Sequence, residues 1–596
     1  MSLIKAKDIA KTIHMQNWGK VGELAGWILM RILRIDKLND FYGQIKHKDG
    51  LDFINSILSN LDVNFDIPED DLKRIPKEGA FITVSNHPLG AIDGILLLKL
   101  LLEQRPDYKV LASFLLEKIE PLQPFIIPVN NFENKKNIKS SMSGIKVALQ
   151  HLQEGKALGI FPAGEVSTYK DGKLIVDKQW DPSALKLIYK AKVPIIPIYF
   201  HAKNSRIFYL LSKIHPILRT AALPSEAISK KRTNISVRIG KPIQVKDQQS
   251  FANYNLLGDF IRKKTYILAK TFEKRRDLSL PKLTKKEKKI KEIIPPIEQK
   301  LLKSDVQKIE KKDLLFEKND YQIFLSDAKE IPNLLQEIYR LREITFRLVG
   351  EGTGEEMDAD KYDKYYKHLI LWDKKNKKIA GAYRMGLGNE IFDKHGIKGF
   401  YLSELFTFDP ELYDMMSKSI EMGRAFVVPE YQQKPFPLFL LWRGIVHTLL
   451  RYPEHEYLIG PVSISDKFSN FSKSLLIEFM KSNFYDAYTA QFVKPKKEFK
   501  VRLKEKDKKF IFEAAQNNLN RFDKLIDELE PGSLKVPILL KKYIKQNARL
   551  ISFNVDPNFN DAIDGLMYIK ISDLPEDTVK PVLEEFENQF NENKKS

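Results

Sequence analysis

The chain contains no cysteine, which excludes disulfides, thiolate–metal centres and a cysteine nucleophile. Its ten histidines are scattered without the spacing of metal ligands, so we expect neither a metal site nor a cofactor. No stretch reaches the roughly 18 uncharged apolar residues of a membrane-spanning helix. The start also lacks the apolar core of a signal peptide, since Lys5 and Lys7 precede a polar stretch. We therefore expect an intracellular protein that attaches to a membrane only peripherally.

Acidic residues are fewer than basic residues: the chain contains 78 Asp and Glu and 98 Lys and Arg, which gives a net charge of +20. Such a surplus favours an anionic partner. Nucleic acid is not expected, because the basic residues are spread along the chain and no aromatic–basic motif of a nucleic-acid-binding module is present. Two partners remain open. One is an anionic membrane surface, near which each basic residue contributes about 1 kcal/mol, and the other is an acidic carrier protein.

Length and composition predict more than one domain. A chain of 596 residues exceeds the roughly 250 to 300 residues at which a single core stops growing. Between residues 60 and 244 short apolar strands alternate with helices, which predicts an α/β domain with helices covering a mixed sheet. Lys and Glu then dominate a stretch interrupted by Pro295 and Pro296, which is typical of a linker. We expect a helical N-terminal segment (1–60), a first domain (61–273), a charged linker (274–312) and a second domain (313–596).

Apolar residues recur at helical spacing between residues 18 and 35, with Lys20, Arg31 and Arg34 around them. The pattern predicts an amphipathic helix. Two interpretations stay open: an anchor in the headgroup zone of a membrane, or a helix packed on the core of the first domain. A second apolar patch, over residues 200–226, leaves a similar choice between contact with membrane or acyl chain and an ordinary buried helix.

The most informative stretch is residues 85–94, Ser-Asn-His-Pro-Leu-Gly-Ala-Ile-Asp-Gly. A strand is predicted over residues 80–84 and a helix over 95–102, so His87 and Asp93 lie on a strand-to-helix turn. A neutral imidazole there can take the proton of an attacking hydroxyl, while the carboxylate holds the ring in the correct tautomer. The alternative for His87 is a surface histidine without a catalytic role.

Two further blocks favour the catalytic interpretation. Residues 161–167, Phe-Pro-Ala-Gly-Glu-Val-Ser, follow a predicted strand, and residues 193–198, Val-Pro-Ile-Ile-Pro-Ile, form another. Together the blocks resemble the glycerolphosphate and lysophosphatidate acyltransferase family over about residues 80–242. The resemblance implies that His87 and Asp93 are the catalytic pair. It also implies substrate contacts for Asn86, Gly90, Gly164, Glu165 and Ser167.

Three departures from the family pattern concern the acceptor. Five residues separate His87 from Asp93 where four are usual, as in a subgroup with a glycine in the middle. Ala163 stands where a glutamate is usual, and Glu165 follows two places on. The block over residues 124–131 lacks the arginine expected there. These departures indicate an acceptor without a phosphate group.

The second half carries its own motifs. Residues 420–428, which include Glu-Met-Gly-Arg at 421–424, are predicted as a strand, and a loop and a helix with one apolar face follow. This order resembles the acyltransferases of the N-acetyltransferase superfamily. The Glu-x-Gly-Arg strand resembles the acyl-homoserine-lactone synthases and, more closely, the ornithine N-acyltransferases. Further matches to the latter lie at residues 358–363, 381–384, 537–543 and 556–560, and other strands are predicted over 368–372, 380–385, 400–408 and 457–463.

This resemblance implies amide formation, in which an amine attacks a thioester. Glu404 or Glu421 would accept the ammonium proton, and Arg384 and Arg424 would hold a carboxylate as arginine forks do. The alternative for Glu421 and Arg424 is a structural ion pair. Further candidates are Ser403 and Asp363.

The acyl donor follows from a missing motif. No glycine-rich loop that would grip coenzyme A is visible between Pro429 and Gly444. Acyl carrier protein presents the same phosphopantetheine without the adenosine phosphates. We therefore expect acyl carrier protein as the donor.

The two halves together predict a two-domain α/β protein that catalyses consecutive steps. The second domain would join an amino acid to a 3-hydroxyacyl chain, and the first would esterify the hydroxyl of that lyso-aminolipid. This arrangement resembles the bifunctional ornithine-lipid synthases, which implies a place at the cytoplasmic face of the inner membrane. Three alternatives stay open: a synthase of glycine lipid or another aminolipid, a lysophosphatidate-type acyltransferase with a non-catalytic second domain, and an inactive membrane-binding scaffold.

Overall fold

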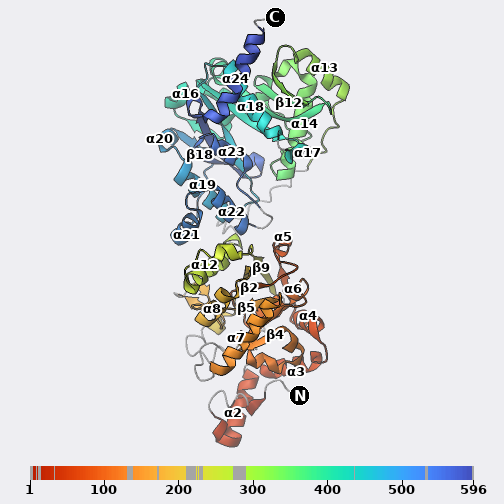
Figure 1. Ribbon diagram of the computed structural model, residues 1–596, viewed down its shortest axis with the longest axis vertical. Helices are drawn as coiled ribbons and strands as arrows, with labels where there is room; N and C mark the ends of the chain where they lie inside the picture. The colour runs from red at the N-terminus through yellow and green to blue at the C-terminus, as the bar shows by residue number, and fades with distance from the viewer. Residues whose placement is uncertain are drawn as a thin grey trace. The chain divides into compact units, whose positions relative to one another are not determined.

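The computed structural model describes residues 5–7, 10, 15–32, 34–129, 138–170, 174–209, 223, 226, 233–272, 290–434, 436–530 and 534–593. The chain divides into two compact units (Figure 1). The N-terminal unit comprises Met1–Lys274 with Asp527–Ser533, and the C-terminal unit comprises Arg275–Ile526 with Leu534–Ser596. Among the described residues, none of the helices combines the length and the apolar content needed to cross a bilayer.

The N-terminal unit is built on a seven-stranded sheet in the order β1-β9-β8-β2-β5-β3-β4. Neighbouring strands pair in parallel, except that β8 and β9 are antiparallel. The strands are β1 (Val63–Asp66), β2 (Phe81–Ser85), β3 (Lys109–Ser113), β4 (Ile126–Val129), β5 (Ala157–Ile160), β8 (Ile195–His201) and β9 (Thr233–Ile239), and a separate hairpin joins β6 (Thr168–Lys170) to β7 (Leu174–Val176). The predicted mixed sheet is confirmed.

Helices cover both faces of this sheet. One core is formed with α4 (Gly50–Asn60) and α6 (Ala91–Leu102). The other is formed with α7 (Ile138–Gln153), α8 (Pro182–Ala191) and α12 (Tyr254–Ile267). The central strands are therefore buried on both sides, which agrees with their nearly continuous apolar sequence.

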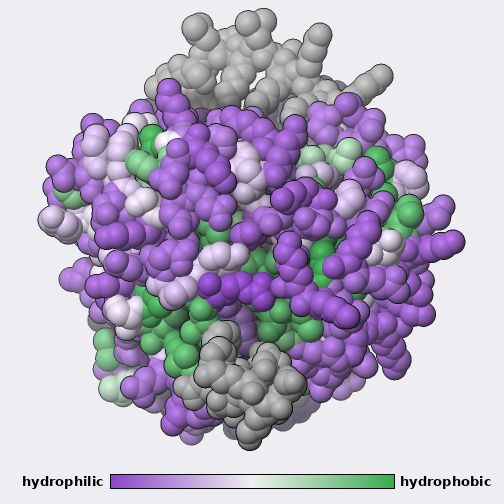
Figure 2. Space-filling model, turned by 90° about the horizontal axis from the view of Figure 1, so that it is seen from above, coloured by the Kyte–Doolittle hydropathy of each residue, from purple (hydrophilic) through white to green (hydrophobic). Residues whose placement is uncertain are grey.

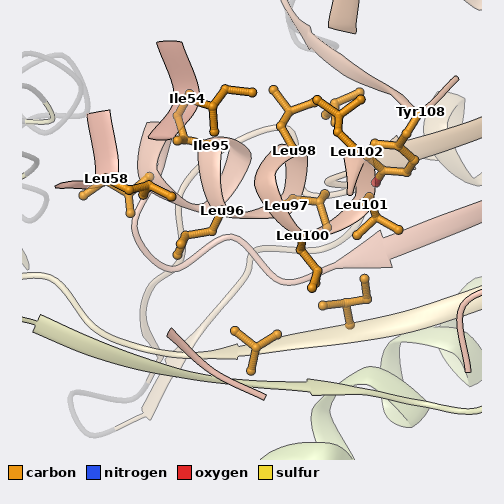
Figure 3. Packing of buried hydrophobic residues seen from close by; sticks show 14 of the residues in the cluster. Ile54, Leu58, Ile95, Leu96, Leu97, Leu98, Leu100, Leu101, Leu102 and Tyr108 are labelled. Carbon is orange, nitrogen blue, oxygen red and sulfur yellow. The ribbon is translucent and has the colours of Figure 1, made fainter. Parts of the chain in front are cut away.

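The helix α6 is apolar on almost every side because it is buried on almost every side. Leu97 and Leu101 are fully buried, and Figure 3 shows the leucines of α6 packed among Ile54 and Leu58 of α4 and Tyr108. This packing fixes α6, and with it the first turn of the helix, in which Asp93 lies.

The C-terminal unit is built on an eight-stranded sheet in the order β10-β11-β12-β13-β15-β16-β19-β18. All neighbours are antiparallel except β15 and β16, which pair in parallel over only three residues each. The strands are β10 (Leu314–Lys318), β11 (Tyr321–Asp327), β12 (Lys367–Asp373), β13 (Lys378–Leu387), β15 (Ser419–Val427), β16 (Tyr457–Ile464), β18 (Arg549–Asp556) and β19 (Ala562–Lys570). The ladder between β15 and β16 thus ends after Glu421, at the centre of the sheet.

Two helices frame the centre of this sheet. The helix α14 (Pro332–Val349) contacts β13 and β15, and α18 (Pro437–Arg451) contacts β11, β12 and β13. The strand predicted over residues 400–408 is wrong in its first half. Tyr401–Glu404 form a 3-10 helix, and only Phe406–Phe408 form a strand, β14, which pairs with β17 (Val493–Pro495). The helical turn arises because Leu402 donates its backbone N–H to Glu421 instead of to a neighbouring strand.

Residues within the predicted linker pack on the C-terminal unit. The helix α13 (Gln299–Ile309) buries Leu302, Val306 and Ile309. Its Asp305 accepts hydrogen bonds from the backbone N–H groups of Asn333 and Leu334, at 2.7 and 3.1 Å, and so caps the start of α14. Residues 273–289 lie outside the described residues.

The surface agrees with the charged composition. The face shown in Figure 2 is mostly hydrophilic, and its hydrophobic residues are gathered in smaller patches between the hydrophilic ones.

Candidate active sites

In the N-terminal unit, the turn between β2 and α6 carries the predicted catalytic pair. Nδ1 of His87 lies 3.2 Å from Oδ2 of Asp93. This contact is not a hydrogen bond, and Nδ1 has no hydrogen-bond partner within the described parts of the chain. The His87 side chain is 18% exposed and Asp93 is fully buried, so the imidazole is open on an edge other than Nδ1. The arrangement orients one ring nitrogen inward and leaves Nε2 for substrate.

The carboxylate of Asp93 is held by the turn itself. Its Oδ2 accepts hydrogen bonds from the backbone N–H groups of Leu89, at 2.7 Å, and Gly90, at 3.1 Å. Burial raises the pKa of Asp93, and the neighbouring His87 opposes that rise. Gly90 adopts a φ of +80°, which lets the chain turn back so that both N–H groups reach the carboxylate.

Two asparagines tie the turn to the rest of the unit. Asn86 donates from Nδ2 to the carbonyl oxygen of Phe200, at 3.0 Å, and accepts from the N–H of Phe200 at 2.8 Å. Asn204 donates to the carbonyl oxygen of Pro88 at 3.0 Å. Asn86 was predicted to contact substrate, but both ends of its amide bond to β8. Its observed contacts position the turn.

The block at residues 161–167 lies directly against His87. The rings of Phe161 and His87 have centroids 4.3 Å apart. Ser167 donates its N–H to the carbonyl oxygen of His87, at 2.8 Å, and its hydroxyl to Oδ1 of Asp177, at 2.5 Å. Asp177 in turn accepts from the N–H of His87 at 3.2 Å. Asp177 was missed by the sequence analysis because a lone aspartate after an apolar run carries no motif.

The structure also places the remaining residues predicted to contact substrate in the two blocks, 85–94 and 161–167. Gly164 has a φ of +64° and donates its N–H to Phe161, which closes a tight turn. Glu165 forms an ion pair with Lys178 at 2.5 Å. Gly90 lies under Leu223 and Val166, which would be 3.0 and 3.2 Å from a Cβ at that position. Of the block over residues 124–131, which lacks the arginine of the family pattern, residues 130 and 131 lie outside the described residues.

The segment over residues 200–226, where it is described, covers this site. Phe208 and Tyr209 are buried with Val166, and Leu223 packs against them. The Tyr209 hydroxyl accepts the N–H of Asn204 at 3.1 Å. Ile207 remains 69% exposed. The described part therefore contains both buried and exposed apolar residues; Leu210, Leu211, Ile217 and Leu218 lie outside the described residues.

In the C-terminal unit, β15 bulges where its ladder with β16 has ended. The register between β13 and β15 shifts between Ala382 and Arg384, and Arg424 adopts a φ of +50°. A residue with a side chain is rarely held in this left-handed conformation, and such strain is concentrated at functional sites. The Arg424 guanidinium lies between two rings, 5.0 Å from the centroid of Tyr401 and 4.5 Å from that of Phe559.

Three arginines and three aspartates form a buried network beside this bulge. Arg342 of α14 bonds to Asp358 and Asp363, with shortest distances of 3.1 and 2.8 Å. Arg384 bonds to Asp360 at 2.6 Å and to Asp363 at 3.2 Å, and Arg424 bonds to Asp360 at 3.2 Å. Arg384 is 1% exposed, whereas the side chain of Arg424 is 11% exposed. Both predicted carboxylate-binding arginines are thus paired with aspartates of the chain.

Glu421 is fully buried in the same region. Its carboxylate accepts hydrogen bonds from the hydroxyl of Tyr366, at 2.6 Å, and from the N–H of Leu402, at 3.1 Å. Burial raises the pKa of Glu421 to about 7. The alternative of a structural ion pair with Arg424 is not what the structure contains, because Glu421 bonds to the Tyr366 hydroxyl and the backbone instead. A carboxyl group with this pKa can exchange a proton near neutral pH.

Glu404 has a different environment. It is half exposed and accepts hydrogen bonds from the hydroxyl of Tyr362, at 2.6 Å, and from Lys361, at 3.0 Å. These bonds, that of Tyr362 first, hold the pKa of Glu404 below its usual value. Ser403 donates its hydroxyl to the carbonyl oxygen of Ile397. Glu404 is therefore a weaker base than Glu421.

A second buried carboxyl group was missed by the sequence analysis. Asp564 of β19 faces Ser463 of β16, whose hydroxyl donates to Oδ1 of Asp564 at 2.7 Å. Burial raises the pKa of Asp564 to about 7, and the charges of Asp556 and Glu351 add to that rise. The sequence around Asp564 carries no motif. Only the pairing of β19 with β16 shows where Asp564 lies: β16 separates β19 from β15, the strand that carries Arg424.

The two folds match known families. Residues 20–274 match a family described as "Acyltransferase", and residues 341–442 match one described as "Acetyltransferase (GNAT) domain". The chain thus carries an acyltransferase domain followed by a GNAT domain and is an acyltransferase enzyme. The sequence-based expectation of an acyltransferase domain followed by a domain of the N-acetyltransferase superfamily is confirmed.

Each half of the chain is similar to a separate bacterial acyltransferase. The glycine N(alpha)-acyltransferase of Bacteroides thetaiotaomicron is 28% identical over 302 residues, which is 48% of this chain and 88% of the relative. That of Phocaeicola vulgatus is 29% identical over 319 residues, 51% of this chain and 96% of the relative. The lyso-glycine lipid O-acyltransferase of B. thetaiotaomicron is 28% identical over 249 residues, 40% of this chain and 88% of the relative.

Proposed function

We propose that the chain is a bifunctional aminolipid synthase. The C-terminal unit joins an amino acid to a 3-hydroxyacyl chain through an amide, and the N-terminal unit then esterifies the 3-hydroxyl of that lyso-aminolipid with a second acyl chain. One observation carries the proposal: a single chain holds both acyltransferase folds and spans 86–96% of the length of separate relatives named for an N-acylation and an O-acylation. The product of the first named reaction is the type of acceptor that the second requires.

In the ester step, His87 serves as the general base. The lyso-lipid hydroxyl attacks the thioester carbonyl, its proton passes to Nε2, the carbon–sulfur bond breaks, and the thiolate leaves with that proton. Asp93 stabilises the imidazolium from the side of Nδ1, at 3.2 Å. The acceptor needs no phosphate group, which fits the absence of an arginine in residues 124–131.

In the amide step, the ammonium group of the amino acid must lose a proton before nitrogen attacks the thioester. Glu421 of β15 and Asp564 of β19 are the two candidates for the base, because both are buried in the sheet and burial brings the pKa of each to about 7. Arg424 is the better candidate for the carboxylate of the amino acid, since its side chain is partly exposed while Arg384 is sealed. Arg384 then holds Asp360 and Asp363 in place.

The donor is acyl carrier protein. Residues 428–436, between β15 and α18, contain no glycine, which does not fit the glycine-rich loop that would bind the pyrophosphate of coenzyme A. The net charge of +20 favours an acidic donor over a neutral one. The same charge and the proposed lipid product support a peripheral position at the cytoplasmic face of the inner membrane.

Glycine is the amino acid that the names of the relatives favour. Ornithine is the second candidate, because Asp556 and Asp564 lie near enough to Arg424 for their charges to interact with it, and these carboxylates could hold a second ammonium group. A site that contains both an arginine and carboxylates would suit a diamino acid.

Lipid analysis tests the proposal. The gene is expressed in a host without aminolipids, and its lipids are separated by mass spectrometry and hydrolysed to release the amino acid. A diacylated aminolipid containing glycine or ornithine is expected, and a variant with His87→Ala and Glu421→Gln together serves as the matched control. Acylation of lysophosphatidate to phosphatidate without any aminolipid would show instead a phosphate-acceptor enzyme with a non-catalytic second domain.

A further inference from the structure

The helix α2 (Gly19–Ile32) exposes its large apolar residues. With Trp18 just before it, the helix carries five such side chains with exposed fractions of 45–62%: Trp18, Val21, Leu24, Trp27 and Ile28. A helix on a protein core would turn residues of this size inward. In Figure 1, α2 lies at one end of the N-terminal unit, beyond the helices that cover the sheet.

Glycines form the inward side of this helix. Gly22 and Gly26 are buried, and a Cβ at either position would collide with the carbonyl oxygen of Met15 or Ala6, respectively. The N-terminal segment therefore crosses α2 in close backbone contact, on the side opposite the large residues. Because only glycine fits this crossing, α2 cannot rotate to bury Trp27 without losing it. The close contact at Gly22 and Gly26 therefore keeps the apolar face of α2 exposed.

Positive charge borders the apolar face. Lys20, Arg31 and Arg34 are exposed, and Arg31 lies with its guanidinium 5.0 Å from the ring centroid of Trp27. The one acidic residue of α2, Glu23, forms an ion pair with Lys7 at 3.1 Å. The surroundings of the apolar face are thus cationic.

We propose that α2 is a membrane-docking helix that lies in the headgroup region of an anionic bilayer, with Trp18, Leu24 and Trp27 inserted and the basic residues on lipid phosphates. The inference rests on the proposed function only in that a lipid product gives the enzyme a reason to bind a bilayer. A helix of 14 residues is about 21 Å long, whereas a helix that spans the hydrocarbon needs roughly 20 residues, or about 30 Å. It suits the interface, where an apolar face is buried and a basic face meets anionic lipid.

The alternative occupant of this face is a second copy of the chain. Two copies of α2 would bring Lys20, Arg31 and Arg34 of each together, and like charges at an interface oppose association. An anionic lipid surface neutralises the same residues. The charge pattern therefore favours the bilayer.

The experiment uses the purified full-length chain and sedimentation with vesicles of phosphatidylcholine, with or without phosphatidylglycerol. The wild type is expected to bind the anionic vesicles at least tenfold more tightly, and less so as salt rises, because screening weakens charge attraction. A variant with Leu24→Glu and Trp27→Glu should lose at least tenfold in binding. Leu256→Glu on α12 is the matched control, since Leu256 is 51% exposed outside α2.

Circular dichroism and size determination accompany the binding assay. Equal binding of the wild type and the folded α2 variant to anionic vesicles would overturn the inference. So would a dimer that the α2 variant dissociates, with no vesicle binding by either protein, because the face would then belong to a second copy. Vesicle binding that depends on α2 in an enzyme that makes no aminolipid would leave this inference standing and refute the proposed function alone.

Discussion

Nδ1 of His87 and Oδ2 of Asp93 lie 3.2 Å apart although five residues separate them. The extra residue is accommodated by Gly90, whose φ of +80° folds the chain back before α6 begins at Ala91. The carboxylate therefore reaches both the imidazole and the backbone of the turn. The spacing that looked unusual in the sequence is compatible with a catalytic pair.

Replacing His87 by alanine is expected to lower ester formation by about 100-fold to 10,000-fold, the usual cost of losing a general base. The mono-acylated amide lipid should accumulate, because the C-terminal unit is untouched. Chromatography of labelled lipids measures both products. His47→Ala, at an exposed histidine, is the control. Normal diacyl lipid from the His87 variant would refute the assignment.

Replacing Asp93 separates its two tasks. Asp93→Asn keeps an oxygen at the Oδ2 position, which accepts the N–H groups of Leu89 and Gly90 and faces His87, but it removes the negative charge that stabilises the imidazolium. We therefore expect lost ester formation with nearly unchanged thermal stability. Asp93→Ala also leaves two buried N–H groups without an acceptor, which costs about 1–3 kcal/mol each. Denaturation and activity assays on both variants test this. If Asp93→Asn retained full ester formation, the carboxylate would be structural only.

Replacing Gly90 and replacing Gly94 by alanine should change the stability of the protein in opposite directions. Gly90→Ala forces a side chain into a φ of +80° and against Leu223 and Val166, which should cost about 1–3 kcal/mol and impair ester formation. Gly94→Ala, in α6 with nothing within 4 Å, should stabilise the protein by about 0.5–1 kcal/mol. Chemical denaturation compares them. Equal stability of the two variants would show that the turn relaxes around Gly90.

The sequence predicted the elements of the N-terminal unit because their signals are local. A strand, a histidine turn and an apolar helix in succession define the site between β2 and α6. Asp177 could not be predicted, since its hydrogen bond to Ser167 depends on how distant segments pack. The two open interpretations of residues 18–35 also needed the structure, because helical periodicity does not reveal that Gly22 and Gly26 face inward.

In the C-terminal unit, the motif Glu421-x-Gly-Arg424 identified the right strand but left the partners of its charges unknown. Tertiary structure pairs Arg424 with Asp360 and Glu421 with Tyr366. Asp564 escaped notice because it approaches the site only through the antiparallel pairing of β19 with β16. Charged residues without a fixed spacing cannot be paired from a sequence.

The arginines of the network should differ in what their loss does. Arg384→Ala removes an arginine partner from the buried Asp363 and from the partly exposed Asp360, which is expected to destabilise the fold by about 3–5 kcal/mol. Arg424→Ala removes a partly exposed side chain, so the larger effect should be a raised KM for the amino acid. Unfolding curves and amide-formation kinetics measure the two effects. A raised KM with unchanged stability for Arg384→Ala would reverse these roles.

The pH dependence of amide formation in two variants can identify the base. Burial raises the pKa of both Glu421 and Asp564 to about 7, so whichever is the base must lose its proton before it can act. We expect kcat/KM of amide formation to rise through about pH 7. Glu421→Gln and Asp564→Asn each retain the shape of the side chain. The variant of the true base should lose both the activity and the rise, whereas the other should keep the profile.

The pH dependence of the stability is the matching control, and burial of the two carboxyl groups fixes the sign of that dependence. Each carboxyl group binds its proton more tightly in the folded than in the unfolded chain, so each makes the fold less stable as pH rises from the unfolded pKa, near 4, through the folded pKa of about 7. Both Glu421→Gln and Asp564→Asn should therefore reduce this loss of stability, whichever group is catalytic. Activity profiles that differ while the stability profiles change alike would assign the base. Wild-type pH profiles of activity in both variants would show that the ammonium proton leaves by another route.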